Sequence, residues 1–443
     1  MGVSERQSDT ATKLKRISQL SERDQSVRVK TLMHLYNEES LTACFHELDG
    51  KKAVGPDGIR KEEYARDLSR NIIDLVERMK RMAYRPGPVR QVLIPKEGKP
   101  GATRPLGISD IEDKIVQSMT RKILEGIYEP LFLSCSYGFR PGRGPHDAVG
   151  DLQDYLYKGK VATVIDVDLA NYFGTIDHRM LEDLLREKIA DERFLRYVVR
   201  MFKAGVLADG ELTISDEGVP QGSICSPILA NLFAHHVIDL WLEETVKAHC
   251  RDKVAVFRYA DDLVICCNSA DDARRVMAAL DKRLNKFKLR MNAEKTKLIP
   301  FSKSAQKAGK QQGTFDYLGF SFHWGTSARG YPIPKVKTSC KRMRSKLKRV
   351  SEWARQVRSS RRLRDIWTSF QRKLRGHLSY YAIEHNYHAA SKFVTEAVRI
   401  VFKWLNRRSQ RRSFSWDKFN QFMQQFPLPE IKLKRLAPTT TRT

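Results

Sequence analysis

The sequence predicts an α+β protein in which a region of mixed helices and strands is followed by a basic, all-helical module. Two observations lead to this fold class. Up to about residue 334, apolar residues recur with helical spacing in some segments and alternate or form β-branched runs in others. From residue 335 onward the spacing is almost entirely helical. With 443 residues, the chain is long enough for two or three domains that each bury a core.

The individual elements are predicted from the period of their apolar residues. Helices are expected, in chain order, at residues 29–48, 62–82, 111–128, 178–202 and 271–287. Strands are expected at residues 89–95, 161–168, 254–259, 263–267, 297–301 and 315–322. Only three residues, Ala260, Asp261 and Asp262, separate two of these strands, and so short a connection predicts a hairpin.

Composition excludes two classes of protein. A hydrophobic content of 41% excludes wholesale disorder, and no apolar run approaches the roughly 18–20 residues that span a bilayer. The seven cysteines form no C-x-x-C pair and no Cys/His cluster with the spacing of a zinc site. Reduced and mostly buried thiols are therefore expected, and with them a cytoplasmic location.

The positive charge of the chain is concentrated in the helical module. Residues 335–412 hold 23 Lys and Arg against four Asp and Glu, so this stretch carries +19 of a total net charge of +28. A shorter run of this kind is usually a solvated surface, but this density, interleaved with aromatic residues, favours a surface that binds a polyanion. The basic residues lie all round the segment, whereas a membrane surface requires one amphipathic stripe. Nucleic acid is the predicted partner.

Three carboxylates are the candidates for chemistry. Asp168 ends one predicted strand, and Asp261 and Asp262 lie at the tip of the predicted hairpin. Asp pairs in turns are commonly turn formers, but Asp166 and Asp168 place charge in a β-branched strand, where an unpaired carboxylate is costly. Oxygen ligands without His or Cys suit Mg²⁺, and two such ions can activate an attacking hydroxyl and stabilise a leaving oxygen. These residues alone leave nucleotidyl transfer and phosphodiester hydrolysis open.

Several sequence motifs resemble those of reverse transcriptases. The first three are DLANYF at 168–173, VPQGS at 219–223 and YADD at 259–262, in the order of that family. Other motifs narrow the resemblance to the reverse transcriptase–maturases of group II introns: IPK at 94–96, RPLGI at 104–108, YGFRPGR at 137–143, YLGF at 317–320, LRGH at 374–377 and WLNRRS at 404–409. The resemblance runs from about residue 28 to about residue 435. The Cys/His pattern of the family's C-terminal endonuclease domain is missing, so that domain is not expected.

The resemblance implies a right-hand polymerase fold. Its parts are expected to be an N-terminal helical extension at 1–50, fingers and palm with a small antiparallel sheet at 51–334, a helical thumb/maturase module at 335–412 and a C-terminal tail at 413–443. Asp168, Asp261 and Asp262 are implied to be the catalytic residues and to hold two Mg²⁺ ions, with the Leu169 carbonyl as a further ligand. The implied nucleotide-binding residues are Lys96, Arg104, Phe173, Gln221 and Gly222, of which Phe173 excludes a 2′-OH by its bulk.

The resemblance implies an RNA-directed DNA polymerase that binds its intron RNA, assists splicing and supports intron mobility. Its expected partners are intron RNA, an RNA template with a DNA or RNA primer, target DNA and dNTPs, in a bacterial cytoplasmic ribonucleoprotein without a membrane. From the charge of the helical module, RNA binding is placed on Arg361, Arg362 and Arg364. Two alternatives stay open: a reverse transcriptase of the same fold recruited to host DNA repair or antiviral defence, and an RNA-binding splicing factor with little polymerase activity.

Overall fold

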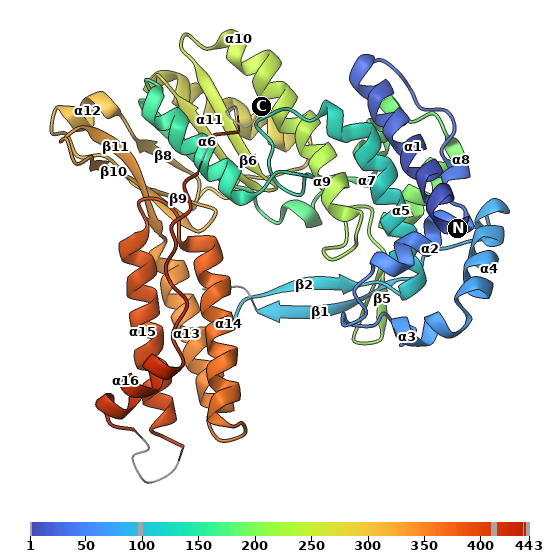
Figure 1. The fold of residues 1–443 in the computed structure, drawn as a ribbon. Coiled ribbons are helices and arrows are strands. Elements are labelled where there is room, and N and C mark those ends of the chain that lie inside the picture. The colour runs from blue at the N-terminus through green and yellow to red at the C-terminus, as the bar shows by residue number, and fades with distance from the viewer. Residues whose placement is uncertain (1, 96–100, 409–413, 437, 440–443) are drawn as a thin grey trace.

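The computed structural model describes residues 2–95, 101–408, 414–436 and 438–439. Its elements form three parts: an N-terminal region at 2–132, a central region at 133–338 and a helical module at 340–425, which extends away from the other two (Figure 1). The predicted α+β class is confirmed. None of the helices in these described ranges is both long and apolar enough to cross a bilayer.

The N-terminal region is built mainly of helices. They are α1 (Gly2–Arg23), α2 (Glu38–Glu47), α3 (Lys61–Tyr64), α4 (Leu68–Lys80) and α5 (Ile111–Tyr128). A four-stranded sheet adjoins them, in the order β2 (Thr103–Ile108), β1 (Val89–Pro95), β4 (Val206–Ala208) and β5 (Glu211–Thr213). Strand β2 pairs along its whole length with residues 90–95 of β1, and in Figure 1 this hairpin extends toward the helical module.

Three of the expected helices are only partly correct, and one carboxylate explains two of the differences. The helix expected at 62–82 is divided into α3 and α4 by a 3₁₀ turn at Ala65–Asp67. The helix expected at 29–48 is confirmed only over α2. Residues 24–37 form no α-helix, because the Asp191 carboxylate accepts the N–H groups of Leu32 and Met33. The helix expected at 178–202 is divided into α7 (His178–Lys188) and α8 (Glu192–Phe202), because Asp191 is also the N-cap of α8. A contact between segments almost 160 residues apart thus overrides local helix propensity.

The central region contains the antiparallel sheet that carries the candidate carboxylates. Its strand order is β6 (Val254–Tyr259), β7 (Asp262–Cys267), β3 (Thr163–Asp168) and β8 (Lys297–Pro300). The helices and helical turns of this region are α6 (Pro145–Lys158), α7, α8, α9 (Ser226–Ala234), two π-helical segments (His235–Asp239 and Trp241–Val246), α10 (Lys247–His249), α11 (Ala270–Lys286) and α12 (Lys303–Lys307).

The two faces of this sheet belong to different hydrophobic cores. Ile165 and Val167 of β3 join the core that α9, α11 and the N-terminal helices share. Val164, on the opposite face, joins a second core with α6 and a three-stranded sheet, in the order β11 (Pro332–Thr338), β10 (Phe320–Thr326) and β9 (Phe315–Tyr317). By strand alternation, Asp166 and Asp168 lie on the face of this second core.

The helical module follows β11 directly. It consists of α13 (Cys340–Val357), α14 (Leu363–Tyr381), α15 (Tyr387–Leu405) and α16 (Trp416–Gln425), which enclose a core of their own. Strand β11 crosses the domain boundary expected between residues 334 and 335. The second core also includes Tyr381 and Ile383 from the end of α14, so the module and the central region share buried surface.

The segment after α16 returns from the far end of the module to the central region. It begins beside α14, where the Trp367 indole donates to the Phe426 carbonyl at 2.8 Å. It then pairs with the end of α14 through a bridge between Lys434 and Ile383. At Thr439 its backbone N–H donates to Asp151 on α6 at 2.7 Å. Figure 1 shows this segment running along the module toward α6.

Candidate active site

The three predicted carboxylates meet at one end of the central sheet. Asp168 is the last residue of β3 and lies directly opposite Asp262, the first residue of β7. Asp261 lies beside them, in the loop between β6 and β7. The predicted hairpin is confirmed, and its loop has only two residues, because Tyr259 and Asp262 already pair.

The hairpin loop holds a strained residue. Ala260 has a left-handed backbone with φ 56, which is a conformation that favours glycine at the first position of a two-residue loop. Gly138 lies directly against it, since a Cβ on Gly138 would be 2.4 Å from the Ala260 nitrogen. The YGFRPGR loop therefore packs on the hairpin so closely that only glycine fits at position 138.

The pKa values of the two hairpin carboxylates, Asp261 and Asp262, are raised. Burial raises the pKa of Asp262 to about 7, with Asp261 adding to the rise and Arg342 opposing it. Asp262 is surrounded by neighbouring segments of the protein, which raises its pKa. Its surface is nevertheless partly accessible to solvent. The pKa of Asp261 is also raised by burial and by Asp168, and is lowered by Arg104.

These carboxylates have the chemistry of a divalent cation site. Among the described residues, no group of three or more His, Cys, Asp or Glu side chains is arranged as a finished metal site. The donors themselves fit, because all are carboxylate oxygens and three of them gather at one end of the sheet. The Lys295 ammonium lies 2.6 Å from Asp168 Oδ1. One of the three carboxylates therefore binds a positive charge in this structure.

The described nucleotide-binding candidates lie on three segments: strand β2, a 3₁₀ turn and the loop that holds Gln221 and Gly222. Arg104 is exposed on β2, and its charge acts on Asp261. Phe173 is half-buried in the 3₁₀ turn Tyr172–Gly174 that follows Asp168. Gly222 has φ 109, and a Cβ there would be 2.4 Å from the Gly107 carbonyl, while the Gln221 carbonyl accepts the Gly107 N–H. Position 222 therefore requires glycine, because any side chain would collide with β2. Lys96 lies outside the described residues.

Comparison with known proteins decides the family. The model of the family described as "Reverse transcriptase (RNA-dependent DNA polymerase)" matches residues 94–322, more than half of the chain. The chain belongs to the reverse transcriptase family.

Its relatives include intron-encoded proteins. Protein YkfC of Escherichia coli is 30% identical over 62% of this chain and 81% of its own length. The group II intron-encoded protein LtrA of Lactococcus lactis is 31% identical over 53% of this chain and 39% of its own length. An uncharacterised 91 kDa protein in the cob intron of Schizosaccharomyces pombe is 35% identical over 46% of this chain and 25% of its own length. This reverse transcriptase is therefore similar to proteins named for introns, one of them for a group II intron.

The reverse transcriptase has a positioning residue that sequence reasoning missed. Arg258 in β6 is fully buried and forms a salt bridge with Asp239, which is also fully buried. The same guanidinium donates to the Asn231 side-chain oxygen at 3.1 Å, to the Ser136 hydroxyl at 2.7 Å and to the Ala260 carbonyl at 3.1 Å. It therefore joins the hairpin of β6 and β7, called the catalytic hairpin after its expected role, to Ser136, which directly precedes the YGFRPGR loop. An Arg inside an apolar strand was the available signal, because a buried charge requires a partner.

The three candidate RNA-binding arginines are brought together. Arg361 and Arg362 lie in the turn between α13 and α14, and Arg364 lies in the first turn of α14. All three are exposed, at the end of the module farthest from the central region (Figure 1). Positive charge at a helix N-terminus opposes the helix dipole. These arginines therefore do not stabilise α14.

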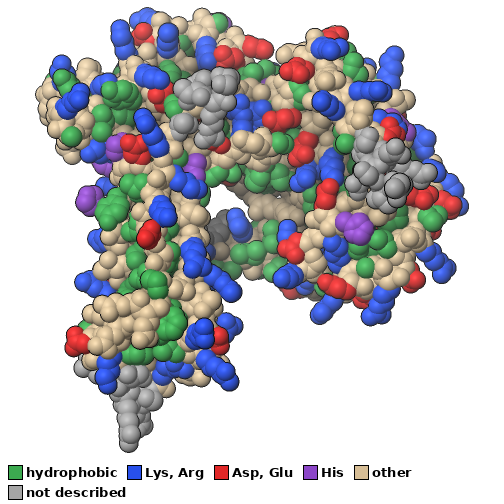
Figure 2. Space-filling view, viewed as in Figure 1, with side chains coloured by type: hydrophobic (Ala, Val, Ile, Leu, Met, Phe, Trp, Pro, Cys, Tyr) green, Lys and Arg blue, Asp and Glu red, His purple; other side chains and the backbone are tan. Residues whose placement is uncertain are grey.

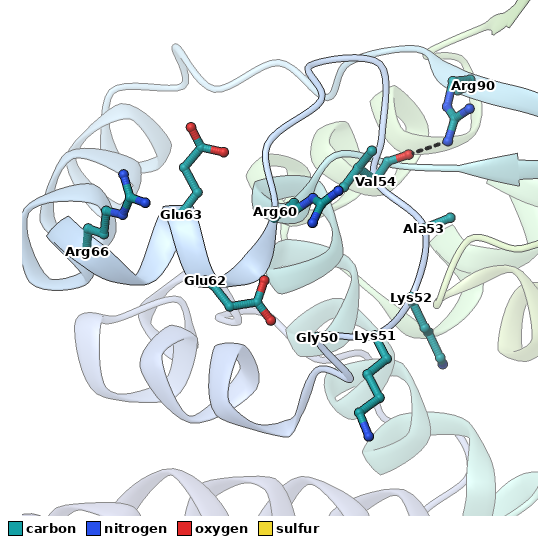
Figure 3. Close-up of a pocket in the computed structure, with 10 residues that line it drawn as sticks. All are labelled: Gly50, Lys51, Lys52, Ala53, Val54, Arg60, Glu62, Glu63, Arg66 and Arg90. Carbon is teal, nitrogen blue, oxygen red and sulfur yellow. Dashed lines mark hydrogen bonds between the residues drawn. The ribbon is translucent and has the colours of Figure 1, made fainter.

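A second concentration of positive charge lies on the N-terminal region of the reverse transcriptase. We call it the basic groove: a cavity of about 840 Å³ lined by Gly50, Lys51, Lys52, Ala53, Val54, Arg60, Glu62, Glu63, Arg66 and Arg90 (Figure 3). Arg90 donates to the Val54 carbonyl at 2.7 Å, and Lys114 donates to the Ala53 carbonyl at 2.9 Å, so the loop at 50–54 is held in place. Figure 2 shows Lys and Arg side chains over both this region and the helical module.

Proposed function

We propose that this reverse transcriptase has the right-hand arrangement, with the N-terminal region as fingers, the central region as palm and the helical module as thumb. The observation that carries the proposal is the pairing of Asp168 with Asp262 beside the Asp261 loop. It places three carboxylates at the end of a sheet that is flanked by two basic surfaces. The predicted parts at 51–334 and 335–412 fit this arrangement.

In this proposal the carboxylates hold two Mg²⁺ ions. Asp168, Asp261 and Asp262 are the ligands, and the Leu169 carbonyl is a further one, since it accepts no hydrogen bond from the described residues. When bound, such ions activate the attacking hydroxyl and stabilise the leaving oxygen. Arg258 contributes by fixing the Ala260 carbonyl, and therefore the position of Asp261, before substrate arrives.

The chain's other residues bind and orient the incoming dNTP. Arg104, together with Lys96, binds the triphosphate through charge-assisted hydrogen bonds. Phe173 excludes a ribose 2′-OH by its bulk. Gln221 and Gly222 bring backbone close to the templating pair, and the packing of Gly222 on β2 fixes that backbone against the strand that carries Arg104.

Two basic surfaces take the nucleic acid in this proposal. The helical module binds the duplex of RNA template with its DNA or RNA primer, and also intron RNA, through Arg361, Arg362 and Arg364. The basic groove takes the unpaired template, because a second cavity shares its residues 50 and 52–54 and is also lined by Gly222 and Ile224. Positive charge thus continues from the fingers to the loop under the templating pair.

The biological setting in this proposal is intron splicing and mobility in a bacterial ribonucleoprotein, with target DNA as a further partner. LtrA is named as a group II intron-encoded protein, and two other relatives are named after the cob intron and COX1/OXI3 intron 1. Recruitment to DNA repair or antiviral defence is less favoured by these relatives. A splicing factor with little polymerase activity is less favoured because all three aspartates are present.

Primer extension on an RNA template tests the proposal directly. The wild-type protein should incorporate dNTPs in Mg²⁺, and the Asp261→Asn variant should lose activity by about 10²-fold or more. Thermal unfolding of the variant should shift little, because the substitution removes carboxylate repulsion. Asp252→Asn, in an exposed turn before β6, is the matched control. Retention of most activity by Asp261→Asn contradicts the assignment of this carboxylate.

A further inference from the structure

Phe139, in the YGFRPGR loop, combines three features that indicate contact with a ligand. Its side chain is 50% exposed. Its backbone is left-handed with φ 57, a conformation that is costly for a bulky side chain. Its ring contacts those of Phe173 and Tyr259, with centroid distances of 6.5 and 6.3 Å. A large apolar ring is thus held partly in solvent, under strain, between the proposed nucleotide gate and the catalytic hairpin.

The neighbours of Phe139 impose this position. On one side, the Tyr137 N–H donates to the Arg258 carbonyl at 2.8 Å, and the buried Asn231 amide donates to the Gly138 carbonyl at 2.6 Å. On the other side, the Arg140 guanidinium donates to the Ser136 carbonyl at 2.9 Å. Backbone strain persists only where the surroundings determine it this fully, and such places cluster at binding sites.

The contact between the two phenylalanine rings is specific in geometry. The planes of Phe139 and Phe173 cross at 84°, which is the T-shaped arrangement that aromatic pairs prefer. Phe173 is only half-buried, so its ring needs a lateral support to act as a steric gate. Phe139 provides that support on the side of the catalytic hairpin, where it also contacts Tyr259. Its exposed surface is available for contact with a nucleotide bound beside Phe173.

We propose that Phe139 is a specificity-determining residue that supports the Phe173 gate and contacts the sugar of the incoming nucleotide. This inference rests on the proposed polymerase function. The two perpendicular rings hold each other in place. A ribose 2′-OH is therefore excluded sterically, because neither ring can shift to make room for it. Without Phe139, the Phe173 ring gains freedom, and the site loses apolar contact with every nucleotide.

The decisive variant is Phe139→Gly. Glycine adopts φ 57 without strain, so the variant removes the ring and relieves the backbone together. Phe139→Leu is the second variant, because it retains apolar bulk without the aromatic contact. Tyr331→Ala, which removes another exposed ring far along the chain on the β10–β11 turn, is the matched control.

Single-nucleotide addition with dNTP and rNTP measures the effect. For Phe139→Gly we expect the KM for dNTP to rise about 3- to 10-fold, in keeping with the loss of an aromatic contact. Relative use of rNTP should rise, the affinity for primer–template should not change, and thermal unfolding should stay near that of wild type. Phe139→Leu should lie between wild type and Phe139→Gly.

The outcomes separate this inference from the proposed function. If wild type extends primers and Phe173→Ala alters sugar selection, but Phe139→Gly leaves both KM and selection unchanged, the inference is wrong and the polymerase assignment stands. A weaker affinity for primer–template with unchanged nucleotide KM also overturns it, because Phe139 would then contact the duplex. Absence of primer extension by wild type contradicts the proposed function itself.

Discussion

Asp113 on α5 is buried in the N-terminal region, with 4% of its surface exposed. Its carboxylate accepts hydrogen bonds from the Tyr84 hydroxyl and the Gly87 N–H. Burial raises its pKa to about 7, and the nearby Asp110 and Glu112 add to the rise. The folded protein therefore binds a proton at Asp113 at a pH where the unfolded chain has released it.

This pKa predicts how stability depends on pH. Because the folded pKa exceeds the unfolded one, the contribution of Asp113 is fully present below about pH 4 and is lost as the pH rises to about 7. The loss reaches roughly 4 kcal/mol, since each pKa unit corresponds to about 1.4 kcal/mol. Urea unfolding of wild type and Asp113→Asn across this range measures it. The difference in unfolding free energy between wild type and Asp113→Asn should change with pH. A difference that stays constant from pH 4 to pH 7 contradicts the raised pKa of Asp113.

Phe173 carries a second prediction at the residue scale. Its replacement by Ala removes bulk from the proposed position of the ribose 2′-OH, so selection against rNTP should fall by about 10-fold or more. The measurement is the ratio of kcat/KM for dNTP and rNTP on an RNA template. The unfolding temperature serves as control, because Phe173 is only partly buried. An unchanged ratio excludes Phe173 as the gate.

At the scale of elements, the catalytic hairpin depends on the Arg258–Asp239 pair. Removing one partner of a fully buried pair costs about 3–5 kcal/mol, because the other charge is left without compensation. Asp239→Asn should therefore lower both stability and kcat. The double variant Arg258→Met, Asp239→Leu replaces the pair with apolar groups, so its stability should recover to within about 1–2 kcal/mol of wild type.

Activity of the double variant decides whether the pair positions the hairpin. The Ala260 carbonyl and the Ser136 hydroxyl lose their donor in this variant. We therefore expect a kcat well below that of wild type with a similar KM for dNTP, measured by single-turnover extension. A double variant that is stable and fully active shows that the pair serves folding alone.

The elements also show which features could be predicted from sequence. The hairpin at 254–267 was predictable because its β-branched strands and its connection are adjacent in the chain. Strand β2 was not predicted, because Pro105 and Gly107 interrupt its pattern, and its pairing with β1 overrides that signal. The strands β4 and β5 have three residues each, too few for a period to show.

The residues of the candidate site also fall into those that the sequence could predict and those that it could not. The meeting of Asp168, Asp261 and Asp262 could be predicted, because two of them lie at the turn of one hairpin and the third ends a predicted strand. The partnership of Arg258 with Asp239 could not, because Asp239 lies in a π-helical segment 19 residues earlier that has no local signature. Which residues meet across the fold depends on tertiary packing, and a single sequence contains this information only indirectly.

At the scale of the whole molecule, the charge of the helical module predicts how RNA binding depends on salt. The triple variant Arg361→Gln, Arg362→Gln, Arg364→Gln should bind RNA more weakly. The slope of log K against log salt should become shallower by about 2, because each lost phosphate contact removes about 0.7–0.9. Stability should not fall, since these charges oppose the dipole of α14.

Filter binding at several salt concentrations provides the measurement. The control variant Lys282→Gln, Lys286→Gln, Lys310→Gln removes the same charge from exposed positions of the central region. If the two variants show equal slopes, net charge alone governs binding. In that case the turn between α13 and α14 is not an RNA-binding site.

The return of the chain from α16 to α6 restricts how the helical module can move. The module joins the central region at β11, at Tyr381 and Ile383, which are buried in the second core, and again where Thr439 reaches Asp151. A rigid body connected at one point can turn in any direction, whereas one held by two chain connections and a shared core keeps its orientation. The module of this reverse transcriptase should therefore turn little relative to the central region, so the space for nucleic acid keeps its direction.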